Sequence, residues 1–349
     1  MEFDIMTRAT TWDQAAALAR RAEAAGFSGM LFTEGHQVPW MNIAAAATAA
    51  PALHFSTGIA IAFARSPMVS AQIAWELAHN TRGRFRLGLG SQVKAHIQRR
   101  YAGTFDRPAP QMKDYVLAVK ACLRAFRRDG PLQHDGPYYK LSLLTEQWTP
   151  ARHDWEDVKV DISAVGPIMV RVAGEVADGV HVHPMHSMHY IKNRLLPGLA
   201  EGAARAGRDP ATVDKIIPVI VAAGDTPEER AQPIREAKTT LAFYGATPNY
   251  AFQFDDLGHT GLRDRLRDCL RSGDEAQSQA LITEEILDQF AVVARWDDVA
   301  DRMIERYRGI ASRLVIYLAS HWRDVDPKVL DRWGEVARAV RGRAEGSAS

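Results

Sequence analysis

The feature that most constrains this chain is a regular alternation of apolar strand patterns with amphipathic helix patterns. Eight short apolar runs are each followed by a helical pattern: EFDIMT, SGMLFTEG, LHFSTGIAIAFA, RFRLGLGSQ, VKVDISAVG, GVHVHPM, KIIPVIVAAG and SRLVIYLAS. Strands that alternate with helices form a parallel sheet with helices on its faces. Eight such units in 349 residues, with no linker and no shift in composition, predict an α/β fold of the (β/α)₈ barrel type, as a single domain over residues 1–349.

A doubly wound Rossmann sheet is the alternative. Its phosphate-binding turn needs spaced glycines directly after the first strand. The turn here, IMTRATTW, contains none, and the pair Gly88 and Gly90 belongs to the fourth strand without a third spaced glycine. The barrel is therefore the expected architecture.

Three segments depart from the alternation. Residues 130–157 are irregular, with HDGPYYKLSLL as a hairpin pattern, and residues 226–308 are mostly helical and form an insertion before the eighth strand. The last residues, about 343–349, end in AEGSAS and are expected to be a disordered tail.

Composition excludes several classes of function. Lys and Arg total 43 and Asp and Glu 42, so the balanced charge gives no general attraction to nucleic acid or to an anionic membrane. The two cysteines, Cys122 and Cys269, lie in helical patterns and cannot make a disulfide framework or a four-ligand zinc site. No signal peptide or membrane span is recognisable, so a soluble cytoplasmic protein is expected.

In a barrel of this type the active site lies at the C-terminal ends of the strands. The second strand ends at Glu34, His36 and Trp40. His36 has the chemistry of a general acid or base, or of a loop histidine that binds a carbonyl group. Trp40 could stack on a planar ligand or cover the barrel mouth.

The sixth strand carries a histidine cluster. His181, His183 and His186 could converge on zinc, with Asp324 as the candidate carboxylate ligand and His321 also near the end of the eighth strand. Alternatively, His181 points into the barrel and His183 faces the site as a hydrogen-bonding group.

The turn after the fifth strand has the features of an anion site. Ser163 and Ala164 leave the strand, Val165 and Gly166 turn, and Pro167 begins a helix whose free N–H groups could hold a phosphate. A tight turn that needs glycine for backbone reasons explains the same pattern. After the fourth strand, a group of basic residues is either a solvated surface or a phosphate-binding rim: Lys94, His96, Arg99 and Arg100.

Three stretches together resemble the luciferase-like family of flavin and deazaflavin oxidoreductases: STGIAIAFARSPMVSAQIAWEL, GRFRLGLGSQVKAHIQRRY and ISAVGPIMVRVAGEVADGVHVHP. The resemblance covers nearly the whole chain, and the branch it is most similar to depends on coenzyme F420. It implies a (β/α)₈ barrel with an insertion before the eighth strand and a cofactor ring at the C-terminal mouth.

The resemblance also implies site residues. A non-proline cis peptide at Gly58–Ile59 would form a bulge behind the ring, and Ala164, Val165 and Gly166 would hold the phosphate. Gly88, Gly90, Ser91 and Lys94 would approach the cofactor from the fourth strand. In deazaflavin-using relatives the second strand ends in Asp-His with a tryptophan four residues later. His36 and Trp40 match this pattern, but Gly35 stands where the aspartate would be, with Glu34 one position earlier.

The resulting hypothesis is an enzyme that transfers hydride between F420 and a small organic substrate. His36 would donate or accept the proton, with Glu34 as a candidate replacement for the aspartate, and Trp40 and His183 would shape the pocket. The long insertion offers further pocket candidates, Phe243, Tyr244, Tyr250 and Phe252. A homodimer is implied by the resemblance.

The alternatives are three. An FMN-dependent monooxygenase on the same fold would use O₂ and reduced flavin from a reductase partner. A zinc-dependent barrel hydrolase would use the three histidines, and a degenerate barrel would bind a ligand without catalysis.

Overall fold

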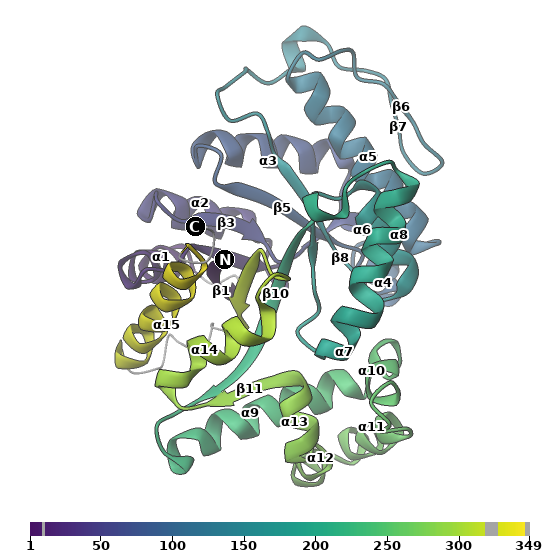
Figure 1. Cartoon of the computed structure of the whole chain (residues 1–349). Helices are drawn as coiled ribbons and strands as arrows, with labels where there is room; N and C mark the ends of the chain where they lie inside the picture. The colour runs from purple at the N-terminus through teal and green to yellow at the C-terminus, as the bar shows by residue number, and fades with distance from the viewer. Residues whose placement is uncertain (9–10, 318–326, 346–349) are drawn as a thin grey trace.

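Eight parallel strands close into a barrel in a computed structural model of the chain, which describes residues 1–8, 11–317 and 327–345 (Figure 1). Each strand pairs with the next, β9 pairs with β10, and the last strand pairs with the first. The barrel strands are β1 (Glu2–Arg8), β2 (Gly29–Thr33), β3 (His54–Thr57), β5 (Phe85–Gly90), β8 (Lys159–Ser163), β9 (Gly179–His181), β10 (Asp214–Ala223) and β12 (Arg313–Ile316). The predicted (β/α)₈ barrel is confirmed, and the closure of the sheet rules out the Rossmann alternative.

A layer of helices surrounds the strands. They are α1 (Trp12–Ala25), α2 (Trp40–Ala49), α3 (Pro67–Asn80), α5 (Pro108–Phe126), α6 (Pro167–Val176), α8 (Leu196–Arg205), α14 (Trp296–Tyr307) and α15 (Pro327–Glu345). Helix α3 begins as the residue types indicate: Ser66 is the N-cap, its hydroxyl accepts the Val69 N–H, and Pro67 takes the first helical position.

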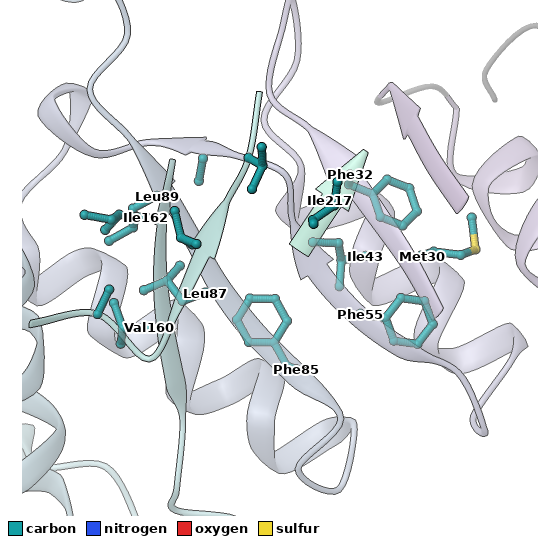
Figure 2. Close-up of a cluster of buried hydrophobic side chains, with 14 of the residues drawn as sticks. Met30, Phe32, Ile43, Phe55, Phe85, Leu87, Leu89, Val160, Ile162 and Ile217 are labelled. Atoms are coloured by element: carbon teal, nitrogen blue, oxygen red, sulfur yellow. The ribbon is translucent and has the colours of Figure 1, made fainter. Parts of the chain in front are cut away.

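Side chains on each barrel strand alternate between the helix layer and the barrel interior. Figure 2 shows the outward set, which includes Leu87 and Leu89 of β5 beside Val160 and Ile162 of β8. The residues between them belong to the inward set, and an apolar cluster within the barrel is formed by Met6, Leu31, Ile216 and Val315.

Two groups of charged residues accompany this apolar cluster. Arg86 forms a two-point ion pair with Asp161, at 2.8 and 2.7 Å, and also contacts Asp214 at 2.8 Å. Arg313 pairs in the same way with Asp4, at 2.5 and 2.8 Å. Each of these charged groups is therefore met by a group of opposite charge.

The predicted hairpin in the irregular segment is confirmed by the antiparallel strands β6 (His134–Asp135) and β7 (Lys140–Leu141). The insertion contains the helices α9 (Pro227–Gly245), α10 (Phe252–Asp255), α11 (Leu262–Ser272), α12 (Glu275–Leu281) and α13 (Glu284–Phe290). These helices bury an apolar cluster beside the barrel.

One strand in this region was not predicted. β11 (Ala291–Ala294) pairs with β10 outside the barrel circuit. Its four apolar residues are too few to distinguish a strand from a buried helical turn by periodicity.

Two predictions concern the end of the chain. His321 and Asp324 lie outside the described residues. Helix α15 continues to Glu345, so the first residues of the expected tail are helical, and 346–349 lie outside the description. Within the described ranges, no helix combines the length and the apolar character needed to cross a membrane.

Candidate active site at the barrel mouth

The third barrel strand is interrupted by a bulge. The peptide bond Gly58–Ile59 is cis, as the resemblance implied, and the strand resumes as β4 (Ala60–Ile61). Ser56 lies opposite Arg86, but Ala60 lies opposite Leu89, so this strand advances four residues while β5 advances three. The extra residue forms a β-bulge, which bends this strand around Ile59 at the C-terminal end of the barrel.

The glycines of β5 make room for this bulge. A Cβ on Gly90 would lie 2.5 Å from Ile59 Cδ1, and a Cβ on Gly88 would lie 2.0 Å from the Thr57 carbonyl oxygen. The Thr57 hydroxyl donates to the Gly88 carbonyl at 2.6 Å and accepts the Gly88 N–H at 2.9 Å. Both glycines therefore accommodate neighbouring protein groups, which is a different need from the close approach of a cofactor.

Glu34 is buried next to the bulge. Its Oε2 accepts the Ile61 N–H at 2.7 Å, and both of its oxygens are bonded to Arg65, at 2.9 and 2.6 Å. The Glu34 side chain is 2% exposed. A carboxylate held in this way is not available to exchange a proton with a substrate, so the candidate catalytic role of Glu34 does not fit its surroundings.

His36 and Gly35 lie on an exposed loop between β2 and α2. The Gly35 carbonyl accepts a hydrogen bond from Arg100 at 2.8 Å, which ties this loop to the end of α4 (Lys94–Arg99). The His36 imidazole forms no hydrogen bond to any residue that the structure describes, so it is free to meet a ligand.

Trp40 is the first residue of α2 and is 7% exposed. Its ring lies 5.5 Å from the Arg65 guanidinium carbon, at a cation–π distance. Trp40 therefore packs against the residue that also binds Glu34.

Ser91 and Lys94 follow β5. Ser91 is half-buried and its hydroxyl donates to the Gln92 carbonyl at 3.2 Å. Gln92 has a left-handed backbone, with φ of 57°, and this turn directs the chain into α4, where Lys94 is exposed. The basic residues on and after α4 thus lie at the same end of the barrel as the bulge.

The start of α6 has the features of an anion site. Gly166 is the N-cap; within the part of the chain that the structure describes, no side chain caps this helix and a Cβ on Gly166 would meet nothing within 4 Å. The turn is held in place because the Val165 carbonyl accepts the Tyr190 hydroxyl at 2.8 Å and the Ala164 N–H donates to the His181 carbonyl at 3.3 Å. The N–H groups of the first turn are therefore left for an anion.

The three histidines at the end of β9 and after it are not arranged to share a metal. His186 Nδ1 lies 2.8 Å from the His183 carbonyl oxygen, and its Nε2 lies 2.9 Å from the Tyr307 hydroxyl, so both ring nitrogens are occupied. His181 points into the barrel, where its Nε2 is 3.8 Å from Asp161 and has no hydrogen-bond partner among the described residues. Among the described residues, no three His, Cys, Asp or Glu side chains form a metal-binding group. The described residues therefore supply no ligand set for the zinc-hydrolase hypothesis.

His183 is instead part of an aromatic cluster. Its ring stacks on Tyr250 with centroids 4.1 Å apart and meets Tyr244 edge-on at 4.6 Å. Its Nδ1 accepts the Met185 N–H at 3.1 Å, which leaves the proton of the neutral ring on Nε2. Burial lowers the pKa of His183 to about 3, so this side chain is a neutral hydrogen-bond donor at physiological pH.

Two residues of this end of the barrel were given no role from the sequence. Arg65 follows the bulge, and a basic residue directly after a run of apolar residues is the sequence feature that could have identified it. Tyr317 follows β12, and its hydroxyl is hydrogen-bonded to that of Tyr244 from the insertion. Nothing in the local pattern around Tyr317 predicts this contact, since the two residues are 73 positions apart.

The buried histidines give a pH prediction. Burial lowers the pKa of His186 to about 4, whereas an unfolded histidine titrates near about 6.5. As the pH falls, the histidine of the unfolded state therefore gains its proton first. The contribution of neutral His186 to the free energy of unfolding is fully present above about pH 6.5 and is lost as the pH decreases toward the folded pKa. His183 acts in the same direction. We expect His186→Gln to reduce the slope of unfolding free energy against pH by up to about 1.4 kcal/mol per pH unit between pH 6 and 4.5.

Urea unfolding at a series of pH values measures this slope. A lower stability of His186→Gln at pH 7 would not disturb the comparison, because only the slope is used. Equal slopes for the variant and the original protein would contradict the assignment of a neutral buried His186.

Comparisons with known proteins agree with this geometry. A family model described as luciferase-like monooxygenase matches residues 1–313. An uncharacterized protein of Mycobacterium tuberculosis is 33% identical over 321 residues, which cover 90% of this chain and 94% of that protein. A putative coenzyme F420-dependent oxidoreductase of the same organism is 26% identical over 305 residues, which cover 82% of this chain and 86% of that one.

Two solved structures illustrate the shared fold. The coenzyme F420-dependent tetrahydromethanopterin reductase of Methanopyrus kandleri has a TM-score of 0.77 at 20% identity, covering 95% of this chain and 97% of that one. The oxygenating constituent of a 3,6-diketocamphane monooxygenase from Pseudomonas putida, in complex with FMN, has a TM-score of 0.66 at 19% identity, covering 97% and 98%.

Proposed function

Because the chain belongs to the luciferase-like monooxygenase family, we propose that it is a coenzyme F420-dependent oxidoreductase that transfers hydride to or from a small organic substrate. The F420-dependent oxidoreductase relative supports the choice of cofactor. The observation that carries the proposal is the combination of the Gly58–Ile59 bulge with the uncapped start of α6 at one end of the barrel. These two features fit a planar ring and a phosphate, respectively.

The deazaflavin, when bound, supplies the carbon that gives or accepts the hydride, and the protein orients the reactants and manages the proton. Ile59 would lie behind the ring, and the N–H groups at Gly166 and the first turn of α6 would bind the phosphate. Ser91 and Lys94 would contact the polar part of the cofactor.

His36 is the proton donor or acceptor in this proposal, because its imidazole is exposed and unpaired among the described residues. His183 would donate a hydrogen bond from Nε2 to an oxygen of the substrate. Trp40, which is the first residue of α2, would form part of the pocket wall. Glu34 takes no part in proton transfer, for the reasons given by its contacts with Arg65 and Ile61.

Separate titrations with reduced and oxidised F420 and with FMN test the cofactor. We expect F420 to bind at least about 100-fold more tightly than FMN, as followed by fluorescence and absorbance. Tight FMN binding without F420 binding would overturn the proposal.

An FMN-dependent monooxygenase is the second candidate, favoured by the family description and by the FMN-bound neighbour. It would need reduced flavin from a reductase partner. Substrate-dependent oxygen uptake in the presence of reduced FMN would support it. With either cofactor we expect a homodimer, which light scattering of the purified protein would test.

A substitution at the start of α6 tests the phosphate site. Gly166→Asp places a carboxylate at the N-cap, where φ of −74° and ψ of 154° suit an Asp side chain. We expect the protein without cofactor to gain only a few tenths of a kcal/mol of stability, about 0.3 kcal/mol, because glycine is itself an acceptable N-cap. The same carboxylate should weaken cofactor binding at least about 10-fold, because it occupies the N–H groups and repels the phosphate.

Gly166→Asn is the matched control, since it caps the helix without adding charge. Its effect on the dissociation constant should be much smaller than that of Gly166→Asp. Equal losses for the two variants would indicate a steric effect, and no loss in either would remove the phosphate from this turn.

A further inference from the structure

We propose that the Glu34–Arg65 ion pair is a positioning device that aligns the Ile59–Ile61 segment with Trp40. The part of this inference that concerns the cofactor rests on the proposed function. The contacts themselves do not, because they are made entirely by the protein. Glu34 and Arg65 thus belong to the site as positioning residues.

The pair holds the strand that follows the bulge from two sides. The Glu34 N–H donates to the Ile59 carbonyl at 3.2 Å, and its carboxylate accepts the Ile61 N–H at 2.7 Å. Arg65 closes the arrangement, because its Nη1 donates both to the Ile61 carbonyl at 2.8 Å and to Glu34 at 2.9 Å. Both backbone polar groups of Ile61 therefore depend on this pair.

Residues Phe32 and Thr33 of β2 hold the first part of the bulge, at Gly58. The Thr33 hydroxyl donates to the Gly58 carbonyl at 2.9 Å, and the Gly58 N–H donates to the Phe32 carbonyl at 3.0 Å. Consecutive residues at the end of β2 thus hold the segment from Gly58 to Ile61. A lost contact at Glu34 would release its C-terminal half while Thr33 still holds the other.

The ion pair is largely shielded from water, and its two-point geometry fixes the orientation of the guanidinium. The side chains of Arg65 and Glu34 are 13% and 2% exposed. Burial alone would lower the pKa of Arg65, but the hydrogen bond and the charge of Glu34 outweigh it and raise the pKa. Two parallel N–H···O bonds define the plane of the guanidinium, so its orientation is set as well as its position.

The oriented guanidinium of Arg65 also contacts Trp40. The guanidinium lies 5.5 Å from the Trp40 ring centroid, and Trp40 begins α2. Arg65 also directly precedes Ser66, the N-cap of α3. One side chain therefore connects the segment behind the ring, the start of α2 and the start of α3.

Hydrogen exchange measures the device without any cofactor. We would compare the original protein with Glu34→Gln, Arg65→Gln and the double variant Glu34→Gln/Arg65→Gln, by mass spectrometry of peptides that cover residues 58–65. Each single variant should exchange about 10-fold to 100-fold faster there, because a buried charged or amide group is left with a mismatched partner. The double variant should recover at least part of this protection, since two amides can bond to each other and to Ile61.

Two further variants keep the test decisive. Arg65→Lys retains the charge, so it should fold, but it lacks the planar fork and should show an intermediate increase in exchange. Arg128→Gln is the matched control, because Arg128 makes the same two-point contact with Glu146 where the side chains are 40% and 81% exposed. It should leave peptides 58–65 unchanged.

The cofactor reports the functional half of the inference. At saturating F420 or FMN, whichever binds, we expect the absorbance maximum of the bound ring to shift in the single variants and to return toward the original in the double variant. A merely structural role would lower the melting temperature and leave this spectrum unchanged.

Unchanged exchange in Glu34→Gln, Arg65→Gln and Arg65→Lys would overturn the positioning device. Faster exchange with an unchanged absorbance spectrum would overturn the inference that the ion pair positions the cofactor ring. Failure of F420 to bind would instead refute the proposed cofactor and leave the exchange result valid.

Discussion

Replacing Gly88 with alanine is expected to lower the free energy of unfolding by about 3 kcal/mol, at the upper end of overpacking effects. The added Cβ would lie 2.0 Å from the Thr57 carbonyl oxygen and 2.6 Å from His181 Nε2. The carbonyl belongs to the backbone and cannot rotate away as the end of a side chain could. The two hydrogen bonds between the Thr57 hydroxyl and the Gly88 backbone would be broken as well.

Urea unfolding at pH 7 measures this cost. Gly35→Ala is the matched control, because a Cβ there would meet no described atom within 4 Å and the residue is exposed. Its stability should stay within about 0.5 kcal/mol of the original protein. A similarly small effect of Gly88→Ala would show that β3 and β5 can separate freely, contrary to the packing described.

Replacing Asp161 with asparagine is expected to cost about 3 kcal/mol, because it removes the fully buried carboxylate of the two that balance the Arg86 charge. Asp161 is 0% exposed and accepts two hydrogen bonds from Arg86. Asp214 contacts the same guanidinium at 2.8 Å, which compensates part of the charge and keeps the expected cost at the lower end of the range for broken buried pairs.

The effect should depend on pH in a defined direction. Burial acts to raise the pKa of Asp161, but Arg86 and the contact with His181 hold it well below its usual range. The folded pKa is lowered, so the stabilisation is complete above the unfolded value of about 3.9 and is lost as the pH falls below it. The difference between the original protein and Asp161→Asn should therefore be constant from pH 5 to 8 and shrink in strong acid.

Asp157→Asn is the control for this series. Asp157 pairs with Lys159 near the start of the same strand, but the two side chains are 80% and 45% exposed. Exposed pairs of this kind contribute little, so the change should be below about 0.5 kcal/mol. A comparable loss in both variants would mean that the Asp161 pair has no special weight.

Most of the fold could be predicted because its signals are local. A parallel strand buried on both faces and an amphipathic helix each leave a pattern within a dozen residues, and their regular order indicates a barrel. The helix starts at Ser66 and Gly166 were recognisable for the same reason, since a cap depends on adjacent residues. β11 was missed because four apolar residues carry no decisive period.

The candidate site was only partly predictable. Strand ends indicated where to look, and residue chemistry proposed His36, His183 and the Gly166 turn as candidates that remain predictions. The cis peptide at Gly58–Ile59 came from the resemblance, because nothing in the residues themselves requires it. The residues alone did not show that Gly88 and Gly90 make room for protein atoms, since those atoms come from β3, β8, β9 and the Ile59 bulge.

Glu34 shows where the boundary lies. The sequence by itself determined that an acid, a glycine and an imidazole follow the second strand, and that this strand belongs to a barrel. Only the tertiary structure decided that Glu34 binds Arg65, 31 residues later, and that His36 remains exposed. Ion pairs of this kind depend on strand register and on a one-residue bulge, and a shift of one residue would turn the same side chains to the opposite face.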